Sequence, residues 1–141
     1  MKRILVCLDP SPRAAQVLER ASALARASGA KMILFRAVGL QHDGQVPPEA
    51  LAMSPEALVE LWRRNAERDL EAVCGGLPPD LVASIAVHVG SPWSAICKAA
   101  HELDVDLIAI GSHGYDPVGH FLGTTATKVV NHADRAVLVV R

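Results

Sequence analysis

The sequence predicts a single α/β domain in which parallel strands alternate with helices along the chain. Five apolar segments of strand length are separated by four segments whose apolar residues recur at helical spacing. Half of the residues are hydrophobic and only 4% are aromatic, which is typical of a sheet covered by helices on both faces. A length of 141 residues suits one domain, spanning residues 1–141, with a full-sized core. The alternation also implies right-handed crossovers between neighbouring parallel strands.

Residues that start or stop each element support these assignments. The expected strands occupy residues 3–8, 31–38, 82–89, 105–110 and 136–140. The expected helices occupy residues 12–28, 55–74, 93–103 and 124–132. Serine is a good N-cap and proline a good first helical residue, and such pairs precede three helices at Ser11-Pro12, Ser54-Pro55 and Ser91-Pro92. Gly29 and the Gly75-Gly76 pair are placed to end the first two helices.

The longest connection, residues 39–53, contains a Pro47-Pro48 pair and mixed polar residues. We expect a surface loop with one helical turn. A long loop after a strand suits a lid over a ligand, and a variable insertion without a role is the alternative.

Residues 104–130 combine a strand, a glycine-rich loop and the start of a helix. The loop carries Gly111, Gly114, Gly119 and Gly123. Glycines let the backbone approach a phosphate, and the N–H groups of a helix N-terminus favour negative charge. The pattern therefore indicates an anion site, although many glycine-rich loops simply turn the chain.

The spacing of these glycines resembles a known signature. Gly111-Ser112-His113-Gly114, followed by eight residues and Gly123-Thr124-Thr125, resembles the nucleotide-binding motif of the universal stress protein family. The tail at residues 126–140 is also similar, and the resemblance runs from the Lys2-Arg3-Ile4-Leu5-Val6 segment to the last strand. The family pattern usually has nine residues between the second and third glycines.

The resemblance implies a specific topology and site. The fold would be a three-layer, Rossmann-like domain of the adenine-nucleotide α-hydrolase-like group, with a five-stranded parallel sheet of order 3-2-1-4-5 flanked by four helices. Strands one and four are then neighbours at the switch point, where open α/β sheets bind ligands. The residues expected to bind the nucleotide are Cys7, Leu8, Asp9, Ala37, Val38, Gly111, Ser112, His113, Gly114, Gly123, Thr124 and Thr125.

Each group of these residues has an expected role and an alternative. Asp9 could accept hydrogen bonds from ribose hydroxyls or hold a hydrated metal, and it could also cap the first helix. Ala37 and Val38 would offer backbone groups to adenine. Thr124 and Thr125 would direct hydroxyls and N–H groups at phosphates, with a simple N-cap as the alternative for Thr124.

The remaining chemistry-bearing residues form no catalytic pattern. The chain lacks a P-loop, a GxGxxG fingerprint and an HxGH motif, and no nucleophile–base pair is evident. The three cysteines and six histidines show no metal-ligand spacing. Trp62 lies on an apolar helical stripe, which favours a core position over a ligand cover. His113 would be peripheral to the site, and Lys128 a surface charge.

Together these features predict a stress-response protein that binds ATP or a related adenine nucleotide, optionally with Mg²⁺, and is not an efficient enzyme. The alternatives are a dimeric interaction protein that holds no nucleotide, and a slow ATPase that uses Asp9. A homodimer is expected through residues 136–140, because this apolar segment would be a sheet edge.

Composition excludes two classes of partner. A formal net charge of −1 with scattered charges is unlike the basic patch of a nucleic-acid-binding protein. No apolar run approaches the roughly 20 residues needed to cross a bilayer. The N-terminal MKRILVCLDP lacks the long apolar region of a signal peptide, so we expect a cytoplasmic protein.

Overall fold

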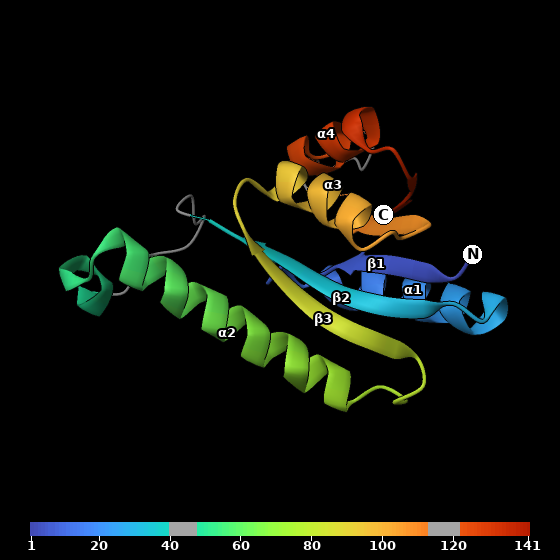
Figure 1. The fold of residues 1–141 in the computed structure, drawn as a ribbon, viewed down its shortest axis with the longest axis horizontal. Helices are drawn as coiled ribbons and strands as arrows, with labels where there is room; N and C mark the ends of the chain where they lie inside the picture. The colour runs from blue at the N-terminus through green and yellow to red at the C-terminus, as the bar shows by residue number, and fades with distance from the viewer. Residues whose placement is uncertain (40–47, 113–121) are drawn as a thin grey trace.

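The computed structural model describes residues 1–39, 48–112 and 122–141, apart from the side chain of Glu49 (Figure 1). The strands are β1 (Arg3–Cys7), β2 (Lys31–Val38), β3 (Val82–Val89), β4 (Leu107–Gly111) and β5 (Ala136–Val140). The helices are α1 (Ala14–Ser28), the short 3-10 helix η1 (Pro48–Ala52), α2 (Pro55–Gly75), α3 (Pro92–Glu102) and α4 (Thr124–His132).

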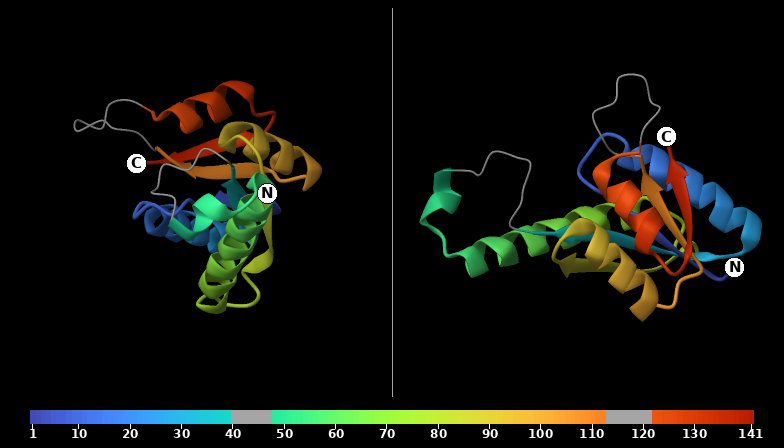
Figure 2. Two further views of the ribbon diagram at one scale, coloured as in Figure 1. Left: turned by 90° about the vertical axis from the view of Figure 1, so that its left-hand side faces the viewer. Right: turned by 90° about the horizontal axis from the view of Figure 1, so that it is seen from above.

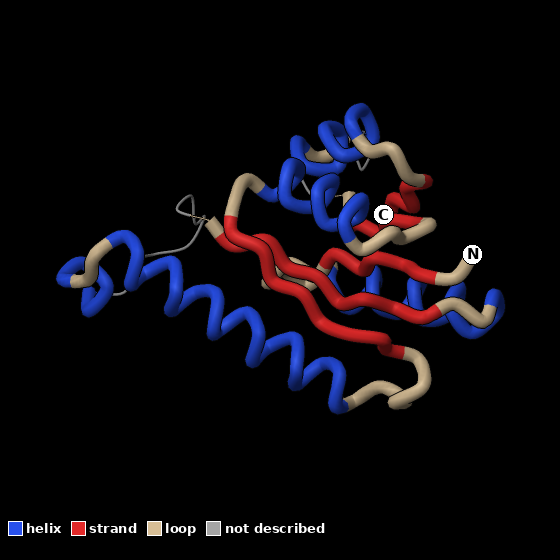
Figure 3. The backbone as a smooth tube through the Cα atoms, in the orientation of Figure 1, coloured by secondary structure: helices blue, strands red, loops and turns tan. Residues whose placement is uncertain are grey.

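The strands form one parallel sheet in the order β3-β2-β1-β4-β5 (Figure 3). β1 lies at the centre, with Ile4 paired to Met32 of β2 on one side and to Leu107 of β4 on the other. The predicted fold class and strand order are therefore confirmed. Since β1 and β4 are neighbours that are far apart in sequence, the chain reverses its winding direction between them.

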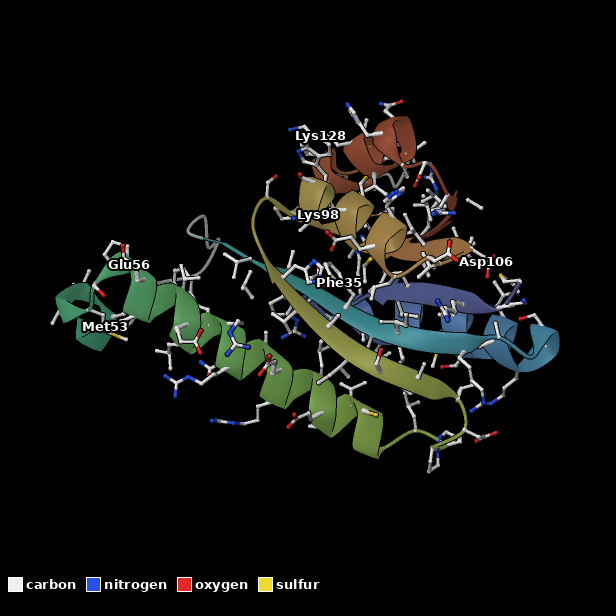
Figure 4. The ribbon with its side chains drawn as sticks, viewed as in Figure 1. Phe35, Met53, Glu56, Lys98, Asp106 and Lys128 are labelled. Atoms are coloured by element: carbon white, nitrogen blue, oxygen red, sulfur yellow. The ribbon has the colours of Figure 1, made fainter. Side chains whose placement is uncertain are left out.

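Helices cover both faces of the sheet (Figure 2). Alternate residues of each strand point to opposite faces, so β1 divides its side chains between two cores. Ile4 and Val6 pack in one core with Val17 of α1, and this core also holds residues of α2. Leu5 and Phe35 pack in the other core with residues of α3 and α4. Phe35 is fully buried, and its side chain lies within the layered body of the domain (Figure 4).

Several predicted start and stop signals are confirmed. The Ser54 hydroxyl accepts the N–H of Ala57 at 3.2 Å, and Pro55 is the first residue of α2. Ser91 and Pro92 begin α3 in the same order. Gly29 follows α1 with φ 72°, a left-handed conformation that glycine adopts without strain. The helical turn expected in residues 39–53 is η1.

The start of α1 differs from the prediction. The N-cap is Arg13 instead of Ser11, and the helix begins at Ala14 instead of Pro12. The cause is Asp9, whose Oδ1 accepts both the Ser11 N–H at 3.0 Å and the Ser11 hydroxyl at 2.6 Å. This local turn occupies the serine side chain. Asp9 thus caps a turn before α1 and not the helix itself.

Smaller differences affect β4 and α4. β4 runs from Leu107 to Gly111, two residues later at its start than predicted. The segment just before β4 is held by a side chain, because the Asp106 carboxylate accepts the backbone N–H groups of Lys2 and Arg3. The N-cap of α4 is Gly123, so the interpretation of Thr124 as an N-cap is wrong.

α2 extends beyond the sheet on the side where β2 ends, and η1 lies at its far end (Figures 1 and 3). Met53 and Glu56 lie at this projecting end, whereas Asp106 lies at the opposite end of the domain (Figure 4). The first half of α2 therefore overhangs the carboxyl ends of the strands. Within the parts of the chain that are described, no helix has both the length and the apolar character to cross a bilayer.

Candidate functional site

A cavity of about 590 Å³ lies at the carboxyl ends of β1, β2 and β4. Its walls come from the segment after β1, from the first half of α2, and from the starts of α3 and α4. The lining residues are Cys7, Leu8, Asp9, Pro10, Ser11, Arg13, Ala14, Val17, Phe35, Arg36, Ala37, Val38, Gly39, Trp62, Asn65, Ala66, Asp69, Pro92, Ile96, Ile110, Gly111 and Thr125. The cavity thus occupies the switch point between β1 and β4, where doubly wound sheets bind ligands.

Most of the site residues predicted from sequence meet at this cavity. Its lining includes Cys7, Leu8, Asp9, Ala37, Val38, Gly111 and Thr125. Ser112 is buried and is not among the lining residues, and Gly123 is the buried N-cap of α4. Thr124 is exposed and does not line the cavity. His113 and Gly114 lie outside the described residues.

Cys7 and Leu8 form an apolar floor beneath the polar residues. Burial raises the pKa of the Cys7 thiol, and the nearby Cys97 and Asp9 raise it further. The thiol is therefore neutral at physiological pH and lacks the thiolate needed for nucleophilic chemistry. Cys7 therefore serves as a small, uncharged part of the cavity wall.

Arg36 is a charged lining residue that the sequence analysis missed. Its Nε donates to the carbonyl oxygen of Leu8 at 2.7 Å, and its Nη1 lies 3.0 Å from Oδ2 of Asp69 on α2. The side chain of Arg36 is only 13% exposed. Arg36 therefore joins the ends of β1 and β2 to the overhanging helix.

α2 contributes a second wall through one side of its first half. The lining residues Trp62, Asn65, Ala66 and Asp69 follow the i, i+3, i+4, i+7 spacing of one helix face. The sequence analysis placed Trp62 in the core, whereas it is half-buried and borders the cavity. The spacing was visible in the sequence, but the overhang of α2 was not.

The opposite end of the cavity is formed by the end of β4 and the starts of α1 and α4. A Cβ atom placed at Gly111 would lie 3.4 Å from Cγ2 of Val17, so α1 packs closely against the end of β4. The Ser112 N–H donates to Val140 O at 2.8 Å, which extends the pairing of β4 with β5. Thr125 lies in the first turn of α4, where helix N–H groups favour anions.

Arg13 also lines this end and was not among the predicted site residues. Its Nη1 donates to the carbonyl oxygen of Ser112 at 2.9 Å and lies 3.4 Å from the Ser112 hydroxyl. The sequence places this basic residue shortly after the first strand. That position indicates a site residue only once α1 is known to lie beside the end of β4.

Across residues 1–39, 48–112 and 122–141, no group of three or more histidine, cysteine or acidic side chains could hold a metal ion. Among the lining residues, the carboxylates are those of Asp9 and Asp69.

The fold and the cavity define a doubly wound α/β ligand-binding domain with its site at the β1–β4 switch point. The sequence model of the Universal stress protein family matches residues 1–141. The chain therefore belongs to the universal stress protein family.

Individual relatives agree with this assignment. Universal stress protein Sll1388 of Synechocystis sp. is 26% identical over 149 residues, covering 99% of this chain and 97% of that protein. Universal stress protein G of Salmonella typhimurium is 37% identical over 112 residues, covering 73% of this chain and 78% of that protein.

Solved structures share the fold. Hypothetical protein MJ0577 aligns with a TM-score of 0.79 at 24% identity, covering 99% of this chain and 94% of that chain. A universal stress protein in complex with cAMP aligns with a TM-score of 0.61 at 24% identity over 99% of this chain and 96% of its own. The universal stress protein from Archaeoglobus fulgidus in complex with dAMP gives 0.57 at 21% identity, covering 100% and 98%.

Proposed function

We propose that this universal stress protein binds ATP or a related adenine nucleotide, and that it acts as a sensor or regulator and not as an efficient enzyme. The observation that carries this proposal is the cavity of about 590 Å³ whose lining includes Asp9, Ala37, Gly111 and Thr125. Its volume falls in the range of small-molecule sites, about 300–1,000 Å³. Family members in complex with cAMP and dAMP lend support.

The proposed orientation of the nucleotide follows from the chemistry of the residues at the two ends of the cavity. The phosphates would lie against Gly111 and Thr125, where backbone and helix N–H groups favour negative charge. The base would lie near Ala37 and Val38, against the apolar wall that Phe35 and Trp62 help to form. Asp9 lies between these ends and is the proposed acceptor for the ribose hydroxyls, with Mg²⁺ optional on the phosphates.

The proposed absence of efficient catalysis rests on the lining residues. Oδ1 of Asp9 already accepts two hydrogen bonds from Ser11, which limits its use as a base for water. Cys7 is held neutral by its raised pKa. A slow ATPase would require Asp9, so phosphate release that is unchanged in Asp9→Ala would contradict that alternative.

We also propose that the protein is a cytoplasmic homodimer. β5 is an edge strand of apolar residues, with backbone groups along one side that do not pair within the sheet. Such edges tend to pair with another strand, and a second copy of the chain is the simplest partner. Sedimentation that shows a monomer at micromolar concentration would contradict the dimer.

Calorimetric titration with ATP tests nucleotide binding, with a matched pair of variants on α4. Thr125→Val keeps the shape of a lining residue but removes its hydroxyl, which should weaken binding by about 0.5–1.5 kcal/mol. Thr127→Val makes the same change at an exposed position and should leave binding unchanged. Gly123→Val should abolish binding, because a branched side chain would enter the path to the helix N-terminus.

Two outcomes would reject the proposal. If the wild-type protein gives no binding heat and no thermal shift with ATP, the interaction-protein alternative is favoured. If Thr125→Val and Thr127→Val weaken binding equally, the nucleotide lies elsewhere. Mass spectrometry of small molecules released from freshly purified protein gives an independent check on the ligand.

A further inference from the structure

Arg13 brings a guanidinium group across the switch point of the sheet. It is the N-cap of α1, and its Nη1 donates to Ser112 O at 2.9 Å across a sequence separation of 99 residues. Its Nη1 also lies 3.4 Å from the Ser112 hydroxyl. The cation is therefore held where β4 ends, at the same end of the cavity as Gly111 and Thr125.

The charge of Arg13 is not cancelled by these contacts, because the carbonyl and hydroxyl of Ser112 are neutral. None of the ion pairs between described side chains includes Arg13. The other lining arginine, Arg36, is instead paired with Asp69 and bonded to Leu8 O. The positive charge of the lining is thus concentrated at one end of the cavity.

Arg13 also retains donors for a ligand. A guanidinium carries five N–H donors in a planar fork, and the hydrogen bonds described here use one nitrogen, Nη1. The fork matches the oxygens of a phosphate group in a bidentate manner. The first turns of α1 and α4 carry no acidic side chain, so no fixed carboxylate in these two turns competes with an incoming anion.

We infer that Arg13 is the specificity-determining residue for the phosphate chain, giving preference to nucleoside di- and triphosphates over monophosphates. This inference rests on the proposed nucleotide site but goes further, since it names a side chain and a ligand class. Adenosine and AMP reach the base and ribose contacts. Each added phosphate brings negative charge toward Arg13, so affinity rises along the series from adenosine to ATP.

The test is a matrix of ligands and variants measured by calorimetry. The ligands are adenosine, AMP, ADP and ATP, and the variants are Arg13→Gln, Arg13→Lys and the control Arg20→Gln. Arg20 is an exposed residue of the same helix, so its replacement removes the same charge away from the lining. Measurements at low and high salt report whether the contact is electrostatic.

The wild-type protein should bind ATP more tightly than AMP. Arg13→Gln should lower ATP affinity about 10- to 100-fold, the range for hydrogen bonds to charged groups, and leave adenosine affinity within about two-fold. Arg13→Lys should keep part of the preference, because it retains the charge and loses the fork. Arg20→Gln should behave as wild type. An unchanged ATP-to-AMP ratio in Arg13→Gln would overturn the inference while leaving the proposed nucleotide site intact.

Inorganic tripolyphosphate separates this inference from the proposed function. In one outcome, tripolyphosphate raises the melting temperature of wild type but not of Arg13→Gln, adenosine gives no binding heat, and ATP gives no more binding heat than tripolyphosphate. The adenine proposal then fails and the inference about Arg13 stands. If neither ATP nor tripolyphosphate acts on wild type, both are overturned. If Arg13→Gln melts below the assay temperature, the ATP-to-AMP ratio of Arg13→Lys decides, and a ratio equal to that of wild type overturns the inference.

Discussion

The Nε atom of Arg36 lies 2.7 Å from the carbonyl oxygen of Leu8, and this contact joins the ends of two neighbouring strands at the edge of the cavity. Leu8 is only 3% exposed, so its carbonyl has little access to water. The same guanidinium reaches Asp69 on α2. One side chain therefore fixes the positions of the floor and one wall of the site.

The first prediction separates the two contacts of Arg36 by their burial. Arg36→Ala should lower the free energy of unfolding by about 1–3 kcal/mol, because a buried carbonyl loses its donor. Asp69→Ala should cost about 1 kcal/mol or less, since the Asp69 side chain is 63% exposed and exposed ion pairs contribute little. Urea unfolding of both variants measures the difference. An equal loss of unfolding free energy in the two variants would show that the ion pair, and not the hydrogen bond to Leu8, stabilises the contact between the strand ends and α2.

Much of the fold could be predicted from local signals in the chain. Ser54-Pro55 and Gly29 mark helix ends through short-range chemistry, which acts within a few residues. Ser11-Pro12 follows the same pattern and fails, because Asp9 two residues earlier competes for the serine. The strand order came from resemblance to a family, since periodicity alone does not say which strands are neighbours.

The site was predicted only where it depends on strand ends and on the glycine motif. Asp9 and Gly111 follow from the position of the switch point, and they line the cavity. Trp62 and Arg36 could not be placed, because their role depends on how far α2 extends past the sheet. Arg13 was missed for a similar reason, since its contact with Ser112 is made across a sequence separation of 99 residues.

The second prediction concerns backbone conformation after β3. Gly90 has φ 148°, a region that residues with side chains rarely adopt. A Cβ atom there would meet nothing within 4 Å, so Gly90→Ala should destabilise by strain alone, about 1–3 kcal/mol. Gly75→Ala is the matched control, because Gly75 ends α2 with equally open space around it. It should be neutral or stabilising by up to about 1 kcal/mol. Thermal unfolding of both variants checks the opposite signs, and equal effects would contradict them.

The third prediction uses the two tryptophans as reporters of the cavity. Trp62 lines it, whereas Trp93 packs against His132 with ring centroids 4.7 Å apart. In Trp93→Phe, the remaining Trp62 emission should change when ATP is added, because the ligand displaces water beside the indole. In Trp62→Phe, the emission of Trp93 should stay nearly constant during the same titration. A response that persists in Trp62→Phe would place the ligand beside Trp93 and His132 instead of beside Trp62.

The fourth prediction follows from the carboxylate that anchors the start of the chain. Asp106 Oδ2 accepts the N–H groups of Lys2 at 2.7 Å and Arg3 at 2.9 Å, and these bonds hold the pKa of Asp106 below its usual value of 3.8. A carboxyl group whose pKa is lowered by folding stabilises the native state above its unfolded pKa. That contribution is lost as pH falls through the folded pKa. Asp106→Asn keeps an acceptor oxygen but removes the charge, so it should melt below wild type at pH 5–8.

The gap between the two proteins should then narrow below about pH 4, because the wild-type carboxyl becomes protonated and neutral like the amide. Melting curves of both proteins between pH 2.5 and 8 measure this gap directly. Carboxyl groups other than Asp106 are present in both proteins, so their titration largely cancels in the difference. A gap that stays constant to the lowest pH would show that Asp106 acts through its shape and not through its charge. A gap that widens on acidification would require a folded pKa above 3.8, opposite in sign to the effect of the two N–H donors.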